Sequence, residues 1–360
     1  MGNLLKKLEA TGRGILTRYL FSRFRKEDVV SGIPPDAPPR SILLMRWDAV
    51  GDMMVSLPWF RKVREVFPEA RIGIVVSGRN APLLAHETGF TRILYDGKPI
   101  PYLRSLAAVA EFAAEAMVNT RIHYDSTTSF LYGMASGAKW LVSADVRERK
   151  LPFNVRVRMP DGRMHISDMM RILLGGLGRE LPGDGPDREP RLSGEEMEFA
   201  SAFWRKAGLR LRGRAVGLNF HARDPRHRWP PGRAAELCRR FSEAGWSTVL
   251  FTMPRQHGLA VSIAESVPGV VAVPACPTVL HAAAVIRDLA MFVSPDTGLV
   301  HVASAYGVPV LGLYIPNEVH LPLWHPWNVE YEMVMGKNSV SEITVDSVVE
   351  AAGRLAGKVF

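Results

Sequence analysis

The segment from Ser294 to Val310 constrains the fold most, because it reads as a strand, a turn, a helix and a second strand in direct succession. An apolar run over 289–293 ends at Pro295, a helix of small residues opens at Asp296, and a second strand follows over 309–314. This succession predicts a parallel βαβ unit. Its Asp-Thr-Gly turn would place backbone N–H groups and a carboxylate at the carboxyl edge of the sheet, where α/β proteins bind phosphorylated ligands. An ordinary crossover with an Asp or Thr helix cap explains the pattern equally well.

Asp-Thr-Gly is also the active-site tripeptide of aspartic proteases, and that interpretation fails for this chain. Such an enzyme needs two carboxylates that share a proton, on an all-β frame. The chain holds one copy of the tripeptide, at 296–298, and a helical pattern follows it.

Short β-branched runs alternate with helical patterns along the rest of the chain. The runs are 41–47, 71–77, 92–95 and 140–142 in the first half, and 215–220, 247–252, 270–273, 289–293 and 308–314 in the second. This alternation predicts two doubly wound parallel sheets, which we expect to face each other across a cleft. The turn-forming stretch 181–190 separates the two series, so we place the domain linker there. A capped helix, with Thr344 or Asp346 as its cap, closes the chain.

Length and composition fit a globular protein of two domains. The chain has 360 residues, 47% of them hydrophobic and 22% charged. Its two cysteines, Cys238 and Cys276, lie in separate predicted elements without metal-ligand spacing, which argues against a disulfide framework or a zinc site. No apolar run reaches the roughly 18–20 residues of a membrane span, and no signal-peptide pattern is present. We therefore expect a cytoplasmic protein.

The charge balance favours anionic partners. The formal net charge is +9, which suits nucleotides, phosphorylated glycans or acidic lipid. We see neither the aromatic motifs nor the paired zinc ligands of nucleic-acid modules, so nucleic acid is not an expected partner.

Residues 1–26 combine apolar side chains at helical spacing with surrounding lysines and arginines. A basic amphipathic helix of this kind can lie on an anionic membrane surface, here the inner face of the cytoplasmic membrane. The alternative is a helix packed against the body of the protein with its basic face in solvent. Gly12 and Gly14 weaken a single continuous helix, and Lys6 stands where a myristoylation signal needs Ser or Thr.

Gly51 and Asp52 follow the first predicted strand. A glycine at the carboxyl end of a strand lets a substrate approach the backbone closely, and it aims Asp52 toward that substrate. A carboxylate there can act as general base on a sugar hydroxyl. The alternative is a helix N-terminal acid that the helix dipole stabilises.

A dense cationic loop, 219–230, follows the first strand of the second series. Arg223, Arg226 and Arg228 could pair with a diphosphate through bidentate hydrogen bonds. A solvated basic loop is the alternative. Because the loop and Asp296 follow strands of the same predicted sheet, phosphate binding is favoured.

These three segments, in this order, resemble glycosyltransferase family 9, the bacterial heptosyltransferases of lipopolysaccharide core assembly. The family's Asp-Thr-Gly-x-x-His-x-Ala-x-Ala-x-Gly-x-Pro signature is matched from Asp296 to Pro309 without a gap. Its other motifs look like Leu44-Met45-Arg46, Gly51-Asp52, Pro58, 67–70, the loop 226–230 and Trp324-His325-Pro326. The resemblance covers most of the chain from Ser41 onward.

The resemblance implies a GT-B fold and an inverting, metal-independent transfer of a sugar, heptose from ADP-heptose, to a lipid-linked glycan acceptor such as lipopolysaccharide core. The absence of an Asp-x-Asp motif agrees with metal independence, and no cofactor is expected. The implied site has Asp52 as catalytic base beside Gly51, and the donor-binding residues Asp296, Thr297, Gly298, His301, Arg223, Arg226 and Arg228. The expected segments are a basic N-terminal segment with a linker (1–40), an acceptor-binding domain (41–190), a nucleotide-sugar-binding domain (191–340) and a C-terminal helix (341–360).

One position departs from the family pattern. His227 stands where the family usually has a lysine two residues before the tryptophan, so Arg226, His227 or Arg228 takes the place of that phosphate contact. The region 95–159, where acceptor recognition would lie, carries no motif that we can match.

Two other functions fit the same sequence. A nucleotide-sugar 2-epimerase shares the two-lobed fold and needs no acceptor. A non-catalytic nucleotide-sugar-binding protein would keep the fold only, and the retention of Gly51-Asp52 and of the His301 motif argues against it.

Overall fold

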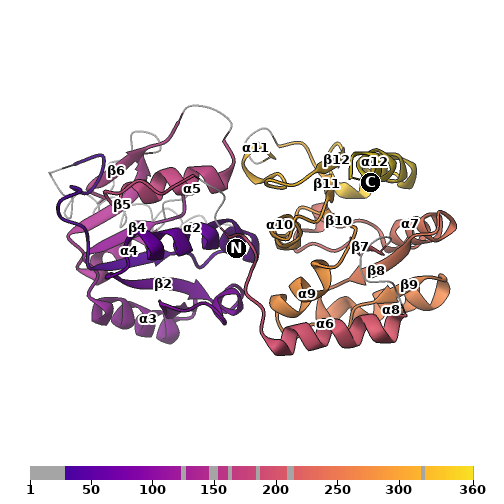
Figure 1. Cartoon of the computed structure of the whole chain (residues 1–360), viewed down its shortest axis with the longest axis horizontal. Helices are drawn as coiled ribbons and strands as arrows, with labels where there is room; N and C mark the ends of the chain where they lie inside the picture. Colours follow the sequence, from indigo (N-terminus) through magenta and orange to yellow (C-terminus); the bar gives the residue numbers. More distant parts are fainter. Residues whose placement is uncertain are drawn as a thin grey trace, which may run out of the picture. The chain divides into compact units, whose positions relative to one another are not determined.

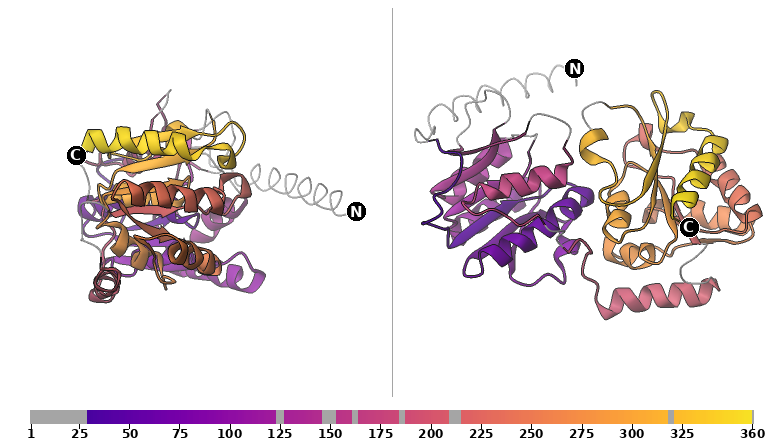
Figure 2. Two further views of the ribbon diagram at one scale, coloured as in Figure 1. Left: turned by 90° about the vertical axis from the view of Figure 1, so that its right-hand side faces the viewer. Right: turned by 45° about the horizontal axis from the view of Figure 1, so that its top comes forward.

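The computed structural model describes residues 29–122, 127–145, 153–160, 164–183, 187–208, 215–317 and 321–359. They form two parallel six-stranded sheets with helices on both faces of each (Figures 1 and 2). Contacts divide the chain into two compact units, with the main divide between Pro186 and Asp187. The predicted basic helix of residues 1–26 lies outside the described residues. The three boundaries between the expected segments, at 40/41, 190/191 and 340/341, stay predictions.

Sheet 1 has the strand order β3-β2-β1-β4-β5-β6. Its strands are β1 (Ser41–Met45), β2 (Arg71–Ser77), β3 (Phe90–Tyr95), β4 (Ala116–Asn119), β5 (Trp140–Asp145) and β6 (Val155–Arg158). Its helical segments are α2 (Val50–Val66), η1 (Ala81–Leu84), α3 (Pro99–Phe112), α4 (Thr127–Ser136) and α5 (Ile166–Gly175). The first strand, β1, lies in the middle of the sheet. Strands β2 and β3 follow on one side of it, and β4, β5 and β6 follow on the other side. The strand order therefore reverses between β1 and β4.

Helices α3 and α4 cover one face of sheet 1. Alternate residues of β1, Leu43 and Met45, join Phe112 of α3 in one buried apolar cluster. On the opposite face, helices α2 and α5 are joined by a hydrogen bond of 2.7 Å from Trp59 Nε1 to Ser167 Oγ. Right-handed crossovers place α2 on that face, because β2 lies on the other side of β1 from β4.

Sheet 2 has the strand order β12-β11-β10-β7-β8-β9. Its strands are β7 (Ala215–Asn219), β8 (Ser247–Phe251), β9 (Val270–Ala272), β10 (Met291–Pro295), β11 (Val310–Tyr314) and β12 (Tyr331–Met335). Its helical segments are α6 (Gly194–Ala207), η2 (Pro225–His227), α7 (Pro231–Glu243), η3 (Pro254–Gln256), α8 (His257–Ser266), α9 (Val279–Ile286), α10 (Gly298–Ala305), α11 (Leu321–Trp324), η4 (Val340–Glu342) and α12 (Val345–Val359). Here the strand order reverses between β7 and β10.

The main core of sheet 2 lies under α7, α8 and α12. Leu218 of β7 and Leu313 of β11 pack there with Leu237 of α7 and Leu355 of α12. Helix α10 instead packs against β10 and β11 and beside α9 (Figure 1). The helix that closes the chain is α12, and the Thr344 hydroxyl accepts a hydrogen bond of 3.3 Å from the Ser347 amide at its start, so Thr344 is the cap.

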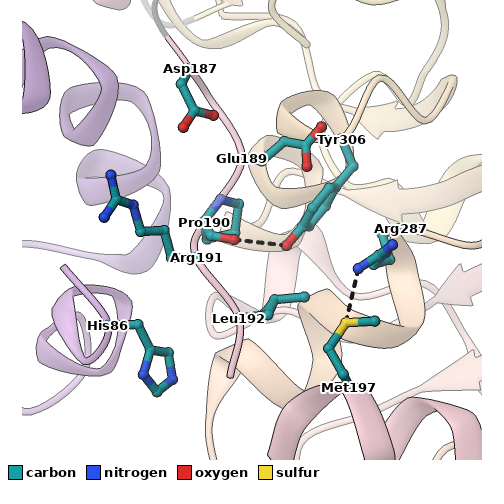
Figure 3. A pocket seen from close by; sticks show the side chains of 9 residues that line it. All are labelled: His86, Asp187, Glu189, Pro190, Arg191, Leu192, Met197, Arg287 and Tyr306. Carbon is teal, nitrogen blue, oxygen red and sulfur yellow. Dashed lines mark hydrogen bonds between the residues drawn. The ribbon is translucent and has the colours of Figure 1, made fainter. Parts of the chain in front are cut away.

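The segment that leads into α6 is fastened to the sheet-2 unit. The Tyr306 hydroxyl donates to the Pro190 carbonyl at 3.1 Å, beside a pocket of about 560 Å³ (Figure 3). The Arg188 guanidinium lies over the Trp327 ring, 5.5 Å from its centroid. Ser193 and Glu196 then form a capping box at the start of α6. Although this stretch is rich in turn formers, its described residues 187–193 are tied down by specific contacts.

The structure confirms the predicted fold class and corrects it in detail. Strands β4, β6 and β12 were not anticipated, because each is only four or five residues long. Helix α10 begins at Gly298, so the prediction that it opens at Asp296 was wrong. The strand β10 continues through Pro295, and two extended residues are needed to turn the chain into the helix.

Candidate functional site

The loops that carry the predicted donor-binding residues meet at the point where the strand order of sheet 2 reverses. Strands β7 and β10 are adjacent and parallel, with Gly217 in register with Phe292. The loop 220–230 leaves the carboxyl end of β7, and the Asp296-Thr297 turn leaves the carboxyl end of β10. Open α/β sheets bind their ligands outside the carboxyl ends of the strands at this position.

A buried, uncharged hydrogen-bond network joins the two strand ends. The Asn219 amide donates to Ser294 Oγ at 3.1 Å and to Thr297 Oγ1 at 3.4 Å. Its carbonyl oxygen accepts from the His221 amide at 3.1 Å. Asn219 and Ser294 are 4% and 0% exposed. Asn219 therefore fixes both loops relative to each other.

The sequence analysis did not assign Asn219 or Ser294. The signal that would have found them is a polar residue ending each of two strands that become neighbours. Only the strand order shows that they are neighbours, because 75 residues separate Asn219 from Ser294.

Helix α10 opens with its N-cap side chain engaged elsewhere. Within the described residues, Thr297 makes no side-chain cap, since its hydroxyl lies 3.1 Å from that of Ser294. The Val300 amide donates to the Thr297 carbonyl at 3.1 Å. Within the described residues, the amides of Gly298 and Leu299 remain for another acceptor, and the positive end of the helix dipole favours an anion there.

His301 and Asp296 lie on either side of this turn. His301 sits in α10 and is 6% exposed, and its ring centroid lies 5.8 Å from that of Trp324. Asp296 is half-buried. The pKa of Tyr314, at the end of β11, is raised by the burial of Tyr314 itself and then by the negative charge of Asp296. The four predicted residues Asp296, Thr297, Gly298 and His301 are thus brought together.

The arginine loop is held in shape largely by its own residues. Arg226 pairs with Asp224 at 2.8 Å, and its side-chain hydrogen bond lowers the pKa of that carboxyl to about 2. Arg228 donates to the carbonyls of Ala222 at 2.9 Å and of Arg223 at 3.1 Å. Arg223 is exposed and makes no ion pair with any residue that the structure describes. Of the three arginine side chains, that of Arg223 is the least engaged by local contacts and so the most available to an anionic ligand.

Trp229 anchors the exit of this loop. Its ring is 1% exposed, and Nε1 donates to the Ile343 carbonyl at 3.0 Å. Its backbone amide donates to the Phe220 carbonyl, also at 3.0 Å. The tryptophan of the Trp-Pro pair therefore has a structural role beneath the loop.

In sheet 1, Asp52 lies in the first turn of α2, near the end of β1. Its Oδ2 accepts a hydrogen bond of 3.1 Å from the Ala49 amide. Asp52 therefore does act as an acidic residue at the N-terminus of α2, and it uses one carboxylate oxygen for this. A carboxylate has several lone-pair sites, so this hydrogen bond does not by itself prevent Asp52 from acting as a base.

The neighbouring Asp48 has different surroundings. Arg121 Nε lies 2.9 Å from its Oδ1, and Arg46 Nη1 lies 3.6 Å from its Oδ2. Arg46 is itself 2% exposed. Two guanidinium groups favour the charged form of the Asp48 carboxylate.

Four aromatic rings cluster toward the same edge of sheet 1. Trp47 lies 5.4 Å from both Tyr95 and Tyr132, and Tyr102 lies 5.8 Å from Tyr132 between ring centroids. Arg121 covers the Trp47 ring at 5.3 Å. Sequence reasoning found no motif here, because the rings come from β3, α3, α4 and the residues that follow β1.

Other predicted features concern metals, thiols and membranes. Both Cys238 and Cys276 are free thiols. In the part of the chain that the structure describes, no cluster of three or more His, Cys, Asp or Glu residues could hold a metal ion, and metal independence stays a prediction. None of the described helices is both long and apolar enough to cross a membrane.

Comparisons with known proteins agree on one family. Residues 128–348 match the model of glycosyltransferase family 9 (heptosyltransferase). The chain is 21% identical over 287 residues to the lipopolysaccharide core heptosyltransferase OpsX of Haemophilus influenzae, covering 77% of this chain and 79% of that protein.

Solved structures share the fold. A glycosyltransferase family 9 crystal structure from Veillonella parvula has a TM-score of 0.74 at 19% identity, covering 91% of this chain and 99% of that one. The Escherichia coli heptosyltransferase WaaC with ADP-2-deoxy-2-fluoro heptose has a TM-score of 0.68 at 18% identity, covering 87% and 99%. At these identities the likeness concerns the fold, and it confirms the predicted GT-B class.

Proposed function

The chain belongs to glycosyltransferase family 9, and from that membership we propose that it transfers heptose from ADP-heptose to a lipid-linked glycan acceptor such as lipopolysaccharide core. The transfer is inverting and needs no metal. The enzyme works in the cytoplasm, at the inner face of the membrane that carries its acceptor. WaaC, which shares the fold, has been solved with an ADP-heptose analogue, which supports this choice of donor.

The observation that carries the proposal is the arrangement at the carboxyl edge of sheet 2. Asn219 ties the arginine loop to the Asp-Thr-Gly turn, and Thr297 leaves the first turn of α10 uncapped within the described residues. In our proposal, the diphosphate of the donor lies against this turn, with His301 and the arginines Arg223, Arg226 and Arg228 around it.

In our proposal, the chemistry then divides between Asp52 and the residues at the carboxyl edge of sheet 2. Asp52 takes the proton from an acceptor hydroxyl while that oxygen forms a bond to the anomeric carbon of the heptose. The bond from this carbon to the diphosphate oxygen breaks, and ADP leaves with the electron pair. The α10 dipole and the arginine loop stabilise the charge that develops on ADP.

The segments would take matching roles. Residues 41–190 bind the acceptor, residues 191–340 bind the nucleotide sugar, residues 1–40 form a basic membrane-facing segment with a linker, and residues 341–360 carry the closing helix. Since the described part of 341–360 packs in the core of sheet 2, that last segment also supports the donor domain.

Product analysis tests the function. The purified protein is incubated with ADP-heptose, with and without lipopolysaccharide that is truncated before its core heptoses, and the products are weighed by mass spectrometry. We expect the glycolipid to gain one heptose and ADP to appear only when both substrates are present. The Asp52→Asn variant is the control, and it should bind donor without forming product.

Two other results would replace the proposal. Conversion of the nucleotide sugar without acceptor would identify a 2-epimerase. Binding of ADP-heptose by calorimetry, with no product from any tested acceptor, would identify a binding protein.

A further inference from the structure

Helix α3 carries the most exposed large apolar side chains of the described residues. Ile100 is 65% exposed and Leu103 is 63% exposed. They are three residues apart, so they lie on the same face of the helix. Ala107, one turn further along that face, is also exposed.

The opposite face of α3 is apolar as well. Val109 and Phe112 are buried in the core of sheet 1, and the Ser105 hydroxyl is hydrogen-bonded to the Tyr102 carbonyl at 2.6 Å. A surface helix normally turns a polar face to solvent, and a helix that is apolar on both faces is covered on both. The outer face of α3 therefore needs a cover that the described residues do not provide.

The exposed charged side chains near the N-terminal end of this face are cationic. Lys98 precedes the helix and Arg104 follows Leu103, and both are exposed. The nearest acid, Asp96, is half-buried and accepts a hydrogen bond from the Lys98 amide at 3.1 Å. Glu111 is exposed and lies one turn beyond Ala107, at the other end of α3.

Apolar side chains flanked by cations match the boundary between anionic headgroups and acyl chains. We propose that this face of α3 (Ile100, Leu103 and Ala107, with Lys98 and Arg104) rests on an anionic lipid surface. At 14 residues, α3 is too short to span a bilayer and would lie in its plane.

The position of α3 beside sheet 1 suggests a function for the lipid contact. The helix directly follows β3, so its first turns lie toward the carboxyl edge of the sheet. Asp52 and Trp47 follow β1 at the same edge. A membrane against α3 would hold a lipid-linked acceptor close to that edge. This use rests on the proposed function, whereas binding to lipid is measured without donor or acceptor.

Vesicle co-sedimentation of the full chain provides the first test. Ile100→Gln with Leu103→Gln should lower the partition coefficient on phosphatidylglycerol-containing vesicles by about tenfold or more, because two apolar side chains no longer leave water. The matched control is Met253→Gln with Leu259→Gln. These residues of the other unit are 57% and 46% exposed, and their replacement should leave binding unchanged. Equal binding by wild type and the α3 variant would overturn the proposal.

Hydrogen exchange locates the contact independently of residues 1–26. With anionic vesicles, the amides of 100–107 should exchange more slowly than in vesicle-free protein, and neutral vesicles should have little effect. Vesicle-bound protein without protection at α3 would contradict the proposal. So would concentration-dependent self-association that Leu103→Gln abolishes, because it would make α3 an interface between copies of this chain.

Salt dependence separates the cationic contribution. Replacing Lys98 and Arg104 together by Gln should weaken binding to anionic vesicles several-fold and flatten its dependence on ionic strength. An unchanged salt dependence would remove the charge part of the argument and overturn the choice of an anionic surface.

Discussion

The two points at which the strand order reverses share a buried asparagine at a strand end, Asn119 of β4 and Asn219 of β7, and differ in the charges beside it. In sheet 1, the strand ends carry charges, with Asp48 held by Arg121 and Arg46. In sheet 2, Asn219 and Ser294 form a buried network without charge. An uncharged network fixes a loop without adding a field of its own, so the α10 dipole and the arginines dominate the potential there. At the edge of sheet 1 the charges of Asp48, Arg121 and Arg46 balance one another. This edge therefore suits a neutral ligand such as a sugar hydroxyl.

The largest effect should come from Asp52→Asn. This change keeps size and hydrogen bonding but cannot take a proton, so we expect turnover to fall on the order of 10²-fold or more. Donor affinity, measured by calorimetry, should stay nearly constant. If Asp48→Asn abolishes turnover while Asp52→Asn does not, the base is the other carboxylate, and the ionic edge of sheet 1 is catalytic rather than structural.

A smaller effect is expected in the arginine loop. Replacing Arg226 and Arg228 by Gln should raise the donor Michaelis constant about tenfold per arginine, since a charge-assisted contact contributes about 1.5–3 kcal/mol. The same change in Arg240, which pairs with Asp346 at 2.9 Å, is the control. Affinity for ADP should fall far more than affinity for adenosine. Equal losses for both ligands would mean that the arginines only shape the loop.

The neutral network should affect folding stability more than chemistry. Asn219→Ala leaves Ser294 and the His221 amide without their partner, so the free energy of unfolding in urea should fall by about 1–3 kcal/mol.

A charge placed in that network sharpens the contrast between the sheets. For Asn219→Asp, burial should raise the pKa of the new carboxyl in the folded state, so stability falls as pH rises above the unfolded value of about 4. We expect this variant to be more stable, relative to wild type, at pH 4 than at pH 7. The opposite trend would show that the network accepts an anion.

The smallest expected change is in the stability of Asp48→Asn. Asp48 and Arg121 are 22% and 19% exposed at their side chains, and partly solvated ion pairs contribute about 1 kcal/mol or less. Denaturation at low and high salt should show this loss shrinking as salt rises. A fall in the free energy of unfolding of more than about 3 kcal/mol would mean that the Asp48–Arg121 pair behaves as a fully buried ion pair.

Residues close in sequence were predictable, and residues brought together by strand order were not. The signature from Asp296 to Pro309 predicts its strand–helix–strand unit because all its signals are local. Asn219 and Ser294 meet only because β10 returns beside β7. The three rings clustered with Trp47 come from β3, α3 and α4. Short strands such as β4 were missed because a fully buried parallel strand has no alternation to detect.

The exposed face of α3 shows the same limit. Its spacing is that of an ordinary helix, and Ile100, Leu103 and Phe112 look alike in the sequence. Which of them faces the core depends on how the helix lies against the sheet. Exposure, and with it the lipid-binding proposal, therefore appears only in the folded structure.

The hydrogen bond from Trp229 to Ile343 has a consequence for synthesis. The loop that carries the arginines is fastened by a carbonyl made 114 residues later, and the core beneath it includes Leu355. While the chain is being translated, the sheet-2 unit cannot close its core or anchor this loop until those residues leave the ribosome. The described strands of sheet 1 end at Arg158, so that unit can fold first. A nascent chain stalled before Ile343 would carry an early-folded half and an exposed, protease-sensitive donor half.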